Sequence, residues 1–173
     1  ILCNNAGVID MANRPVWETP RAVLDWMMGV NIWGVVHGLQ AFMPIMLEQD
    51  TEGHVVNTSS IAGLMSSPDD AFYNMTKHAV VALSEATYLD LVRKRAKVKV
   101  SVLCPGFVRS RFIDAERNRP TRLEQDSPAV HASRQERIET MRRVLQEGMP
   151  PAEVAAHVLS AIRKEQFYIL PDP

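Results

Sequence analysis

Residues 54–77 read HVVNTSSIAGLMSSPDDAFYNMTK, which joins a strand-like run, a loop and the start of a helix. The β-branched residues of His54–Thr58 predict a short strand that leads into Ser60. The serines, aspartates and proline between residues 61 and 71 predict a loop. Ser60 is therefore expected at the carboxyl end of a strand.

Tyr73 and Lys77 lie four residues apart, on a helix predicted over residues 73–95. This spacing places the two side chains on one face, roughly one turn apart. The phenol has a reference pKa of ~10, and we expect the Lys77 cation to lower it by favouring the phenolate. A substrate hydroxyl or carbonyl held by Ser60 would exchange its proton with Tyr73 while a hydride leaves or arrives from a cofactor. The pattern predicts dehydrogenase chemistry, although this spacing alone also occurs by chance on helices.

Strand and helix patterns alternate on either side of this stretch. The strand patterns lie at residues 1–4, 98–104 and 167–170, and helix patterns follow Thr19-Pro20, run over residues 31–46 and follow Pro151. The first of these helices is expected to end near Met28 and Gly29. Residues 112–148 are polar, arginine-rich and weakly periodic, which predicts a mobile or helical insertion outside the sheet.

This alternation predicts an α/β fold, with a parallel sheet and helices on both of its faces. Ligands bind such sheets at the carboxyl ends of the strands, where Gly7, Ser60 and Gly106 all fall. The chain of 173 residues fits one domain.

The composition, with a net charge of −1 and 46 % apolar residues, gives no bias toward nucleic acid. No uninterrupted apolar run reaches the roughly 18 residues of a membrane span. Cys3 and Cys104 lie in apolar, strand-like contexts, so we expect buried free thiols in a reducing compartment. The histidines show no metal-ligand spacing, and no metal is expected. We expect a cytoplasmic protein without a nucleic-acid or membrane partner.

Four motifs together resemble the short-chain dehydrogenase/reductase family in its single-domain form. They are Asn4-Asn5-Ala6-Gly7, the double serine at Ser60, the Tyr73/Lys77 pair, and Pro105-Gly106-Phe107-Val108. Their order and their spacing both match the family. The resemblance implies a Rossmann-like sheet, an NAD or NADP cofactor and a small alcohol or carbonyl substrate.

The resemblance also implies the roles of individual residues. Asn31, Ser60, Tyr73 and Lys77 would form the catalytic tetrad, with Asn31 holding a water that links Lys77 to solvent. Asn31 also fits a helix cap, and the two roles are compatible. The cofactor site would comprise the tetrad's Tyr73 and Lys77, the latter bonded to the nicotinamide ribose, together with Asn4, Ala6, Gly7, Pro105, Gly106, Val108 and Ser110.

The departure from the family lies at the front of the chain, where no glycine-rich TGxxxGxG turn appears. At ~30 or more residues per βαβ unit, roughly 80 residues with the N-terminal strands would be missing. Residues 1–173 would then be the C-terminal part of one dinucleotide-binding domain, with a variable substrate-side insertion at about 110–148. We expect this chain alone to bind dinucleotide weakly and to turn over little, because it lacks the helix N-terminus that holds the pyrophosphate.

The sequence also fits other interpretations. The chain could be a non-enzymatic fragment or a degenerate relative that acts by self-association, and the resemblance implies a homodimer or homotetramer in either case. A sugar-nucleotide epimerase shares YxxxK, but the roughly 60 residues after Gly106 are too few for its second domain. The nine arginines between Arg109 and Arg143 favour either an anionic ligand or a solvated helical face.

Overall fold

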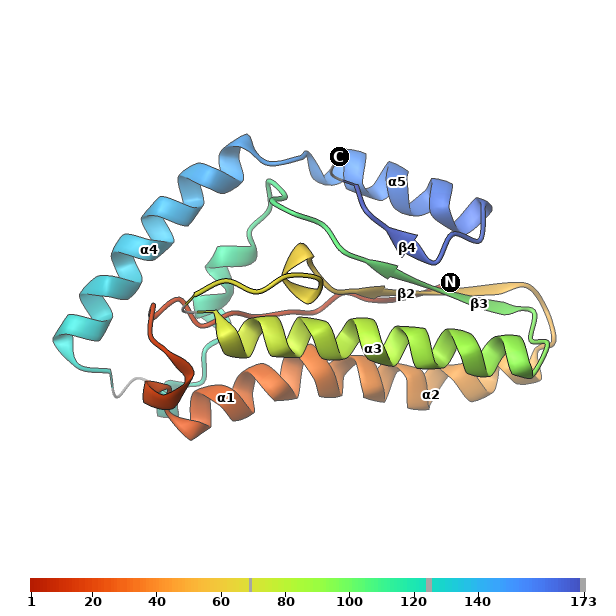
Figure 1. Cartoon of the computed structure of the whole chain (residues 1–173), viewed down its shortest axis with the longest axis horizontal. Helices are drawn as coiled ribbons and strands as arrows, with labels where there is room; N and C mark the ends of the chain where they lie inside the picture. Colours follow the sequence, from red (N-terminus) through yellow and green to blue (C-terminus); the bar gives the residue numbers. More distant parts are fainter. Residues whose placement is uncertain (69, 124–125, 172–173) are drawn as a thin grey trace.

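The computed structural model describes residues 1–68, 70–123 and 126–171. Within these ranges, parallel strands form one sheet in the order β1-β2-β3-β4 (Figure 1). The strands are β1 (Leu2–Asn4), β2 (Gly53–Thr58), β3 (Val98–Leu103) and β4 (Tyr168–Ile169). The parallel α/β sheet predicted from the sequence is confirmed.

Helices cover both faces of this sheet. Successive residues of β2 point to opposite faces, so neighbouring valines pack against different helices. Val55 packs against α2 (Gly34–Glu48) and α3 (Ala71–Arg93). Its neighbour Val56 packs against α5 (Pro151–Arg163) on the opposite face. The two faces have separate apolar cores, and the sheet lies between them.

The first helical region differs from the prediction of two helices divided near Gly29. Helix α1 (Arg21–Met28) continues through a π-helical turn, η2 (Gly29–Trp33), directly into α2. Gly29 keeps helical backbone angles of φ −57° and ψ −42°, so it does not make the left-handed turn that ends many helices. Asn31, predicted to begin a helix, lies buried inside the π-helical turn.

This continuous helix, Arg21–Glu48, is long and apolar enough to cross a membrane by length and composition. Counting uninterrupted apolar runs missed it, because polar residues such as Asn31 and Gln40 divide the sequence. In the structure its α2 part contributes Leu39 and Met43 to the core of the sheet. We therefore interpret it as a helix of the globular fold.

The segment after β3 is helical, which was one of its two predicted alternatives. It contains the 3₁₀ segments η4 (Phe112–Asn118) and η5 (Thr121–Leu123), followed by α4 (Pro128–Glu147). Ser127 caps α4 by accepting a hydrogen bond from the backbone N–H of Val130, and Pro128 occupies the first turn. Two further 3₁₀ segments, η1 (Val16–Glu18) and η3 (Ile61–Gly63), complete the described helices.

A cluster of buried charges joins this C-terminal segment to the loop after β1. Asp10 accepts from the guanidinium groups of Arg14, Arg119 and Arg134 at 3.0, 2.9 and 3.1 Å. Asp126 pairs with the same three arginines, and all five side chains are at most 10 % exposed. We call these five residues the Asp10 network.

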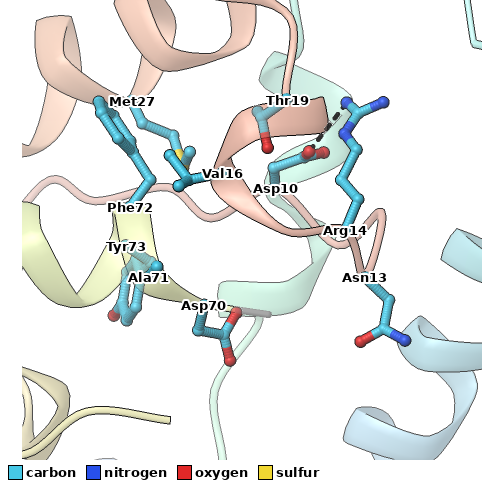
Figure 2. A pocket seen from close by; sticks show the side chains of 10 residues that line it. All are labelled: Asp10, Asn13, Arg14, Val16, Thr19, Met27, Asp70, Ala71, Phe72 and Tyr73. Carbon is cyan, nitrogen blue, oxygen red and sulfur yellow. Dashed lines mark hydrogen bonds and ion pairs between the residues drawn. The ribbon is translucent and has the colours of Figure 1, made fainter. Parts of the chain in front are cut away.

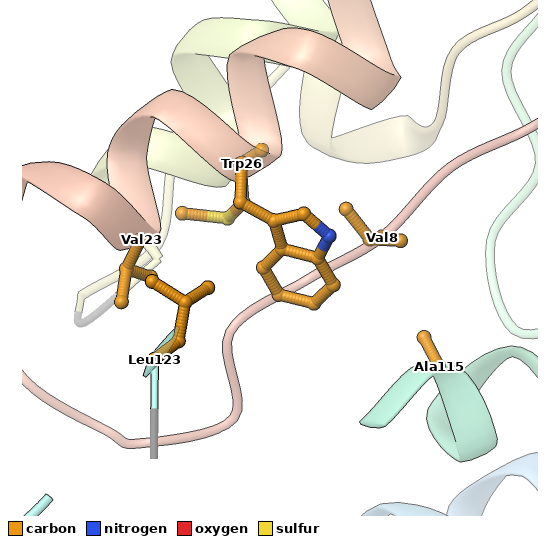
Figure 3. Close-up of a cluster of buried hydrophobic side chains, with 6 residues drawn as sticks. Val8, Val23, Trp26, Ala115 and Leu123 are labelled. Carbon is orange, nitrogen blue, oxygen red and sulfur yellow. The ribbon is translucent and has the colours of Figure 1, made fainter. Parts of the chain in front are cut away.

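An apolar cluster lies in the same region. It contains Trp26 and Val23 of α1, Val8 of the loop after β1, Ala115 of η4 and Leu123 of η5 (Figure 3). Residues far apart in the sequence therefore form one buried unit beside α1.

Both cysteines are free thiols, as predicted, but only Cys104 is buried. Cys3 is exposed because β1 is the edge strand of the described sheet and pairs only with β2. The prediction of a buried Cys3 was therefore wrong.

Candidate active site

Ser60 links the loops that follow β2 and β3. It caps η3, where its Oγ accepts from the Ala62 backbone N–H at 3.2 Å. The same hydroxyl donates to the Pro105 carbonyl at 3.4 Å, and the Ile61 backbone N–H donates to that carbonyl at 2.9 Å. The serine therefore stands at the carboxyl ends of two neighbouring parallel strands, where such sheets bind ligands.

The predicted helical pair lies at the beginning of α3, directly beside Ser60. The Lys77 ammonium is 5.7 Å from the centroid of the Tyr73 ring, so the two side chains share a face as expected. Lys77 is only 3 % exposed, and its Nζ donates to the Thr58 carbonyl at 3.2 Å. The Ser60 hydroxyl is close enough to Tyr73 to lower the phenol pKa by hydrogen bonding. The structure thus brings Ser60, Tyr73 and Lys77 together.

The prediction that the pKa of the Tyr73 phenol is lowered was wrong. Burial raises the pKa of Tyr73, because the phenolate loses its hydration, and this effect exceeds the lowering by Ser60. The Asp70 carboxylate raises that pKa further. Burial also lowers the pKa of Lys77 to about 8. Desolvation of the pair, which a sequence does not reveal, therefore sets the direction of both pKa shifts.

Asn31 is 1 % exposed and ties the loop after β1 to α3. Its Oδ1 accepts from the Val8 N–H at 2.8 Å, and its Nδ2 donates to the Val8 carbonyl at 2.9 Å and to Thr76 Oγ1 at 3.0 Å. Thr76 Oγ1 in turn donates to the Tyr73 carbonyl at 2.8 Å. Both amide protons of Asn31 are used, so only an oxygen of this residue is left to hold a water.

Gly7 keeps the space beside Lys77 open. A Cβ atom at this position would lie 3.3 Å from Lys77 Nζ, 3.7 Å from Asn31 Oδ1 and 3.8 Å from a ring carbon of Phe112. Among the described contacts, Lys77 Nζ has one carbonyl partner although an ammonium carries three protons. A buried ammonium with spare donors beside a glycine fits the diol of a nucleotide ribose.

Asn4 and Ala6, predicted to line the same cofactor site, occupy different environments. Asn4 Nδ2 donates to Asn57 Oδ1 at 2.9 Å, which links β1 to β2. Ala6 is exposed at the end of β1. The structure therefore places Asn4 as a tie within the sheet and leaves Ala6 accessible to a ligand.

The loop after β3 carries the remaining predicted cofactor residues. Pro105 and Gly106 are partly buried beside the Ser60 loop. Val108 turns inward against the core on the α5 side. Ser110 is exposed, and its Oγ accepts from the Phe112 N–H at 3.4 Å. Among these residues, Ser110 presents an exposed side-chain hydroxyl.

Residues from the C-terminal segment also reach the site, and the sequence analysis missed them. The Phe112 ring lies 6.2 Å from the Tyr73 ring, and Ile138 and Leu145 of α4 belong to the apolar cluster against which Tyr73 packs. A small pocket beside Tyr73 is lined by Asp10 and Arg14 of the loop after β1 and by Asp70 (Figure 2). Apart from Asp70, which lies three residues before Tyr73, no local spacing links these groups to Tyr73, so the sequence carried no signal for them.

Comparison with known proteins agrees with this geometry. The sequence profile of the short chain dehydrogenases matches residues 1–121. The chain belongs to the short-chain dehydrogenase family. The CLA biosynthesis dehydrogenase/reductase of Lactiplantibacillus plantarum is 32 % identical over 175 residues, covering 100 % of this chain and 60 % of that protein. The C alpha-dehydrogenase of Sphingobium sp. is 30 % identical over 173 residues, covering 100 % and 54 %.

Solved structures of short-chain dehydrogenases show the same fold. The crystal structure of a family member from Burkholderia phymatum in complex with NAD has a TM-score of 0.87 and 39 % identity, covering 99 % of this chain and 60 % of that one. A Sphingobium yanoikuyae structure in complex with NADPH has a TM-score of 0.72 at 20 % identity, which shows the fold alone. This short-chain dehydrogenase chain therefore spans about 60 % or less of the curated relatives described above.

Proposed function

We propose that this chain acts as an oxidoreductase that transfers a hydride between NAD or NADP and an alcohol or carbonyl substrate. The observation that carries the proposal is the convergence of Ser60, Tyr73 and Lys77 at the carboxyl ends of β2 and β3. The naming of two relatives as dehydrogenases supports the reaction type. A relative solved with NAD supports a nicotinamide cofactor.

Each side chain has one role in the proposed reaction. The Ser60 hydroxyl orients the substrate oxygen, and the Tyr73 hydroxyl gives its proton to that oxygen in reduction or receives one in oxidation. Burial raises the pKa of Tyr73 and keeps the phenol protonated near neutral pH, which favours its role as the acid in carbonyl reduction. Asn31 fixes the backbone at Tyr73 through Thr76 and completes a proton path to water.

The bound dinucleotide would supply or accept the hydride at its nicotinamide ring. Lys77 would hold the nicotinamide ribose with the donors that its carbonyl contact leaves unused. Gly7 and Ala6 would line the ribose side of the site. Pro105, Gly106, Val108 and Ser110 would line the carboxamide side, where the Ser110 hydroxyl is accessible.

The decisive substitution is Tyr73→Phe, which removes the proton donor and little else. We expect turnover to fall by at least about 100-fold, the lower range for loss of a general acid, with an unchanged circular dichroism spectrum. Tyr88→Phe, on an exposed part of the same helix, is the matched control. Measurement with both NADH and NADPH on the protein in its full natural length also assigns the cofactor. A Tyr73→Phe enzyme with a near-normal rate would exclude Tyr73 as the acid/base.

We further propose that residues 1–173 form the C-terminal part of a single dinucleotide-binding domain. The proposal is supported by the chain's coverage of 60 % and 54 % of two relatives. The 173-residue chain by itself should then bind dinucleotide weakly. Saturable, tight NADPH binding by this chain in calorimetry would contradict that proposal, whereas the absence of any turnover by the longer protein would favour the non-enzymatic alternative.

Self-association is proposed on a separate observation. Large apolar side chains are exposed along α2 and α3, namely Phe42, Ile45, Tyr88, Leu89 and Val92. Burying such side chains between two copies would remove them from water. We propose a homodimer or homotetramer in the cytoplasm, where the free thiols Cys3 and Cys104 stay reduced.

A further inference from the structure

Helix α4 lies outside the part of the chain matched by the family profile, which ends at residue 121. It nevertheless packs in the same apolar cluster as the proposed acid/base. Ile138 and Met141 of α4 belong to the apolar cluster that includes Tyr73. Any effect of α4 on Tyr73 therefore comes from residues outside the stretch that the family profile matches.

One charged contact joins α4 to the start of the catalytic helix. Arg137 Nη2 donates to both oxygens of Asp70, at 2.6 and 2.7 Å. The two side chains are 15 % and 20 % exposed, so the ion pair is largely shielded from water. Shielded pairs are screened less than surface pairs, and their charges act on neighbouring groups more strongly.

Asp70 occupies the N-cap position of α3, three residues before Tyr73. An aspartate here normally accepts a backbone N–H of the first turn, yet the Asp70 side chain makes no capping hydrogen bond. Its carbonyl accepts from the Asn74 N–H instead, and its carboxylate turns to Arg137. The aspartate thus exchanges a local cap for a contact with an element 67 residues away.

The same carboxylate faces the pocket that Tyr73 lines (Figure 2). A negative charge beside a phenol opposes its ionisation, and Asp70 accordingly raises the pKa of Tyr73. The other charged or titratable groups around this site are Lys77 of α3, Asp10 and Arg14 of the loop after β1, and Cys104 after β3. Arg137 is the cation bound directly to Asp70.

We propose that Arg137 is a positioning residue for Tyr73. Its ion pair with Asp70 holds α4 on the start of α3 and offsets the carboxylate beside the phenol. The proposal rests on the proposed function of Tyr73 as the acid/base. Arg137 acts through Asp70 and touches no reacting atom.

Direct titration of Tyr73 tests this role without any need for turnover. Replacing the tyrosines by 3,5-difluorotyrosine lowers their pKa values into an accessible range, and ¹⁹F NMR then follows each phenol, with Tyr73 assigned by its loss in Tyr73→Phe. Arg137→Gln should raise the Tyr73 pKa by about one unit, and Asp70→Asn should lower it. In an Asp70→Asn background, Arg137→Gln should have less than half its effect, because the arginine is no longer held in place.

Two variants on the same helix provide the controls. Arg137→Lys keeps the charge, and since a single nitrogen of Arg137 makes the pair, a lysine should retain most of the effect. Arg143→Gln removes an exposed arginine and should leave the titration unchanged. If the enzyme is active, the pH profile of alcohol oxidation should shift upward in Arg137→Gln by the same amount as the titration, with KM nearly unchanged.

An unchanged Tyr73 titration in Arg137→Gln would overturn the inference. An unchanged titration in Asp70→Asn would do so as well, and this variant serves if Arg137→Gln fails to fold. Failure of the proposed function has a different signature, namely retained turnover in Tyr73→Phe. The two failures are therefore distinguishable.

Discussion

Lys77 is a buried cation, and its burial destabilises the folded protein although the residue belongs to the candidate site. Burial lowers its pKa from 10.5 to about 8. Between these two values the unfolded chain holds the proton more tightly than the folded chain does. The free energy of unfolding therefore rises with pH between about 8 and 10.5. The cost of burying the charged Lys77 is fully present below pH 8. At 1.36 kcal/mol per pKa unit, the cost near pH 7 is about 3 kcal/mol.

Replacing Lys77 with methionine should remove that cost. We expect Lys77→Met to be more stable than the parent by about 2 kcal/mol at pH 7, because about 1 kcal/mol is lost with the bond to the Thr58 carbonyl. Toward pH 10.5 this gain should be lost and the variant should become about 1 kcal/mol less stable than the parent, because only the loss of the bond to Thr58 remains. Calorimetric unfolding at both pH values tests this, with Lys94→Met, at the exposed end of the same helix, as the control. A stability difference that does not depend on pH would contradict the argument.

The candidate site could be proposed from the sequence because the order and spacing of its residues suit proton transfer. Ser60, Tyr73 and Lys77 meet as predicted. The direction of the Tyr73 pKa was not predictable, since it depends on burial by Phe112 and by α4. These neighbours come from a segment whose sequence has little periodicity.

At the level of elements, α2 lies close to β1 because Gly38 has no side chain. A Cβ atom at Gly38 would lie 2.1 Å from Asn4 Oδ1 and 2.9 Å from Asn4 Cγ. Asn4 cannot simply swing away, since it is bonded to Asn57 of the neighbouring strand. Gly34, one turn earlier in the same helix, has open space around it.

These two glycines give a matched pair of substitutions. Gly38→Ala should destabilise the protein by about 1–3 kcal/mol, because the steric clash exceeds the gain of roughly 1 kcal/mol in helix propensity. Gly34→Ala should stabilise it by up to about 1 kcal/mol. Urea denaturation measures both. Equal effects at the two positions would mean that the contact with Asn4 does not determine how closely α2 approaches the sheet.

The boundaries of the elements were predicted well where a strand or helix ended at a proline or at a polar loop. The helix containing Asn31 was not, because Gly29 is a common stop signal. In the structure the chain continues through a π-helical turn whose Asn31 is held by Val8 and Thr76. Such tertiary hydrogen bonds override the local signal and are not visible in a single sequence.

At the scale of the whole molecule, the Asp10 network connects the first loop to the C-terminal helices. The pairs of Asp10 with Arg119 and Arg134 join residues 109 and 124 positions apart, so no local pattern could have identified them. The sequence suggested an anionic ligand or a solvated face for these arginines. Arg119 and Arg134 instead lie buried in ion pairs.

Asp10→Asn should show how strongly this network holds the molecule together. The substitution keeps the shape of the side chain but removes the charge opposite three buried guanidinium groups, so we expect a loss of about 3–5 kcal/mol. Asp25→Asn removes the partner of Arg21 in an exposed pair and should change the stability by less than about 1 kcal/mol. Guanidinium denaturation measures the free energy of unfolding of both variants. Similar losses in the two would contradict the proposed importance of the Asp10 network.

The proposed self-association is also a property of the whole molecule. Phe42→Glu with Leu89→Glu would place charges on the exposed faces of α2 and α3. We expect this double variant to sediment as a monomer while the parent protein sediments as a dimer or tetramer. Trp17→Glu, which changes another exposed apolar residue, should leave the assembly intact. A monomeric parent protein would contradict the proposed self-association.

The position of Trp26 gives the molecule its own optical reporter. This indole lies in the apolar cluster of Figure 3, with the Arg119 guanidinium 6.0 Å from its ring, whereas Trp17 and Trp33 are 82 % and 50 % exposed. In a Trp17→Phe/Trp33→Phe background, emission would come from Trp26 alone. Detachment of η4 and η5 from α1 would hydrate the indole and shift its emission to longer wavelengths. The attachment of η4 and η5 to α1 could thus be followed by fluorescence in real time without an added label.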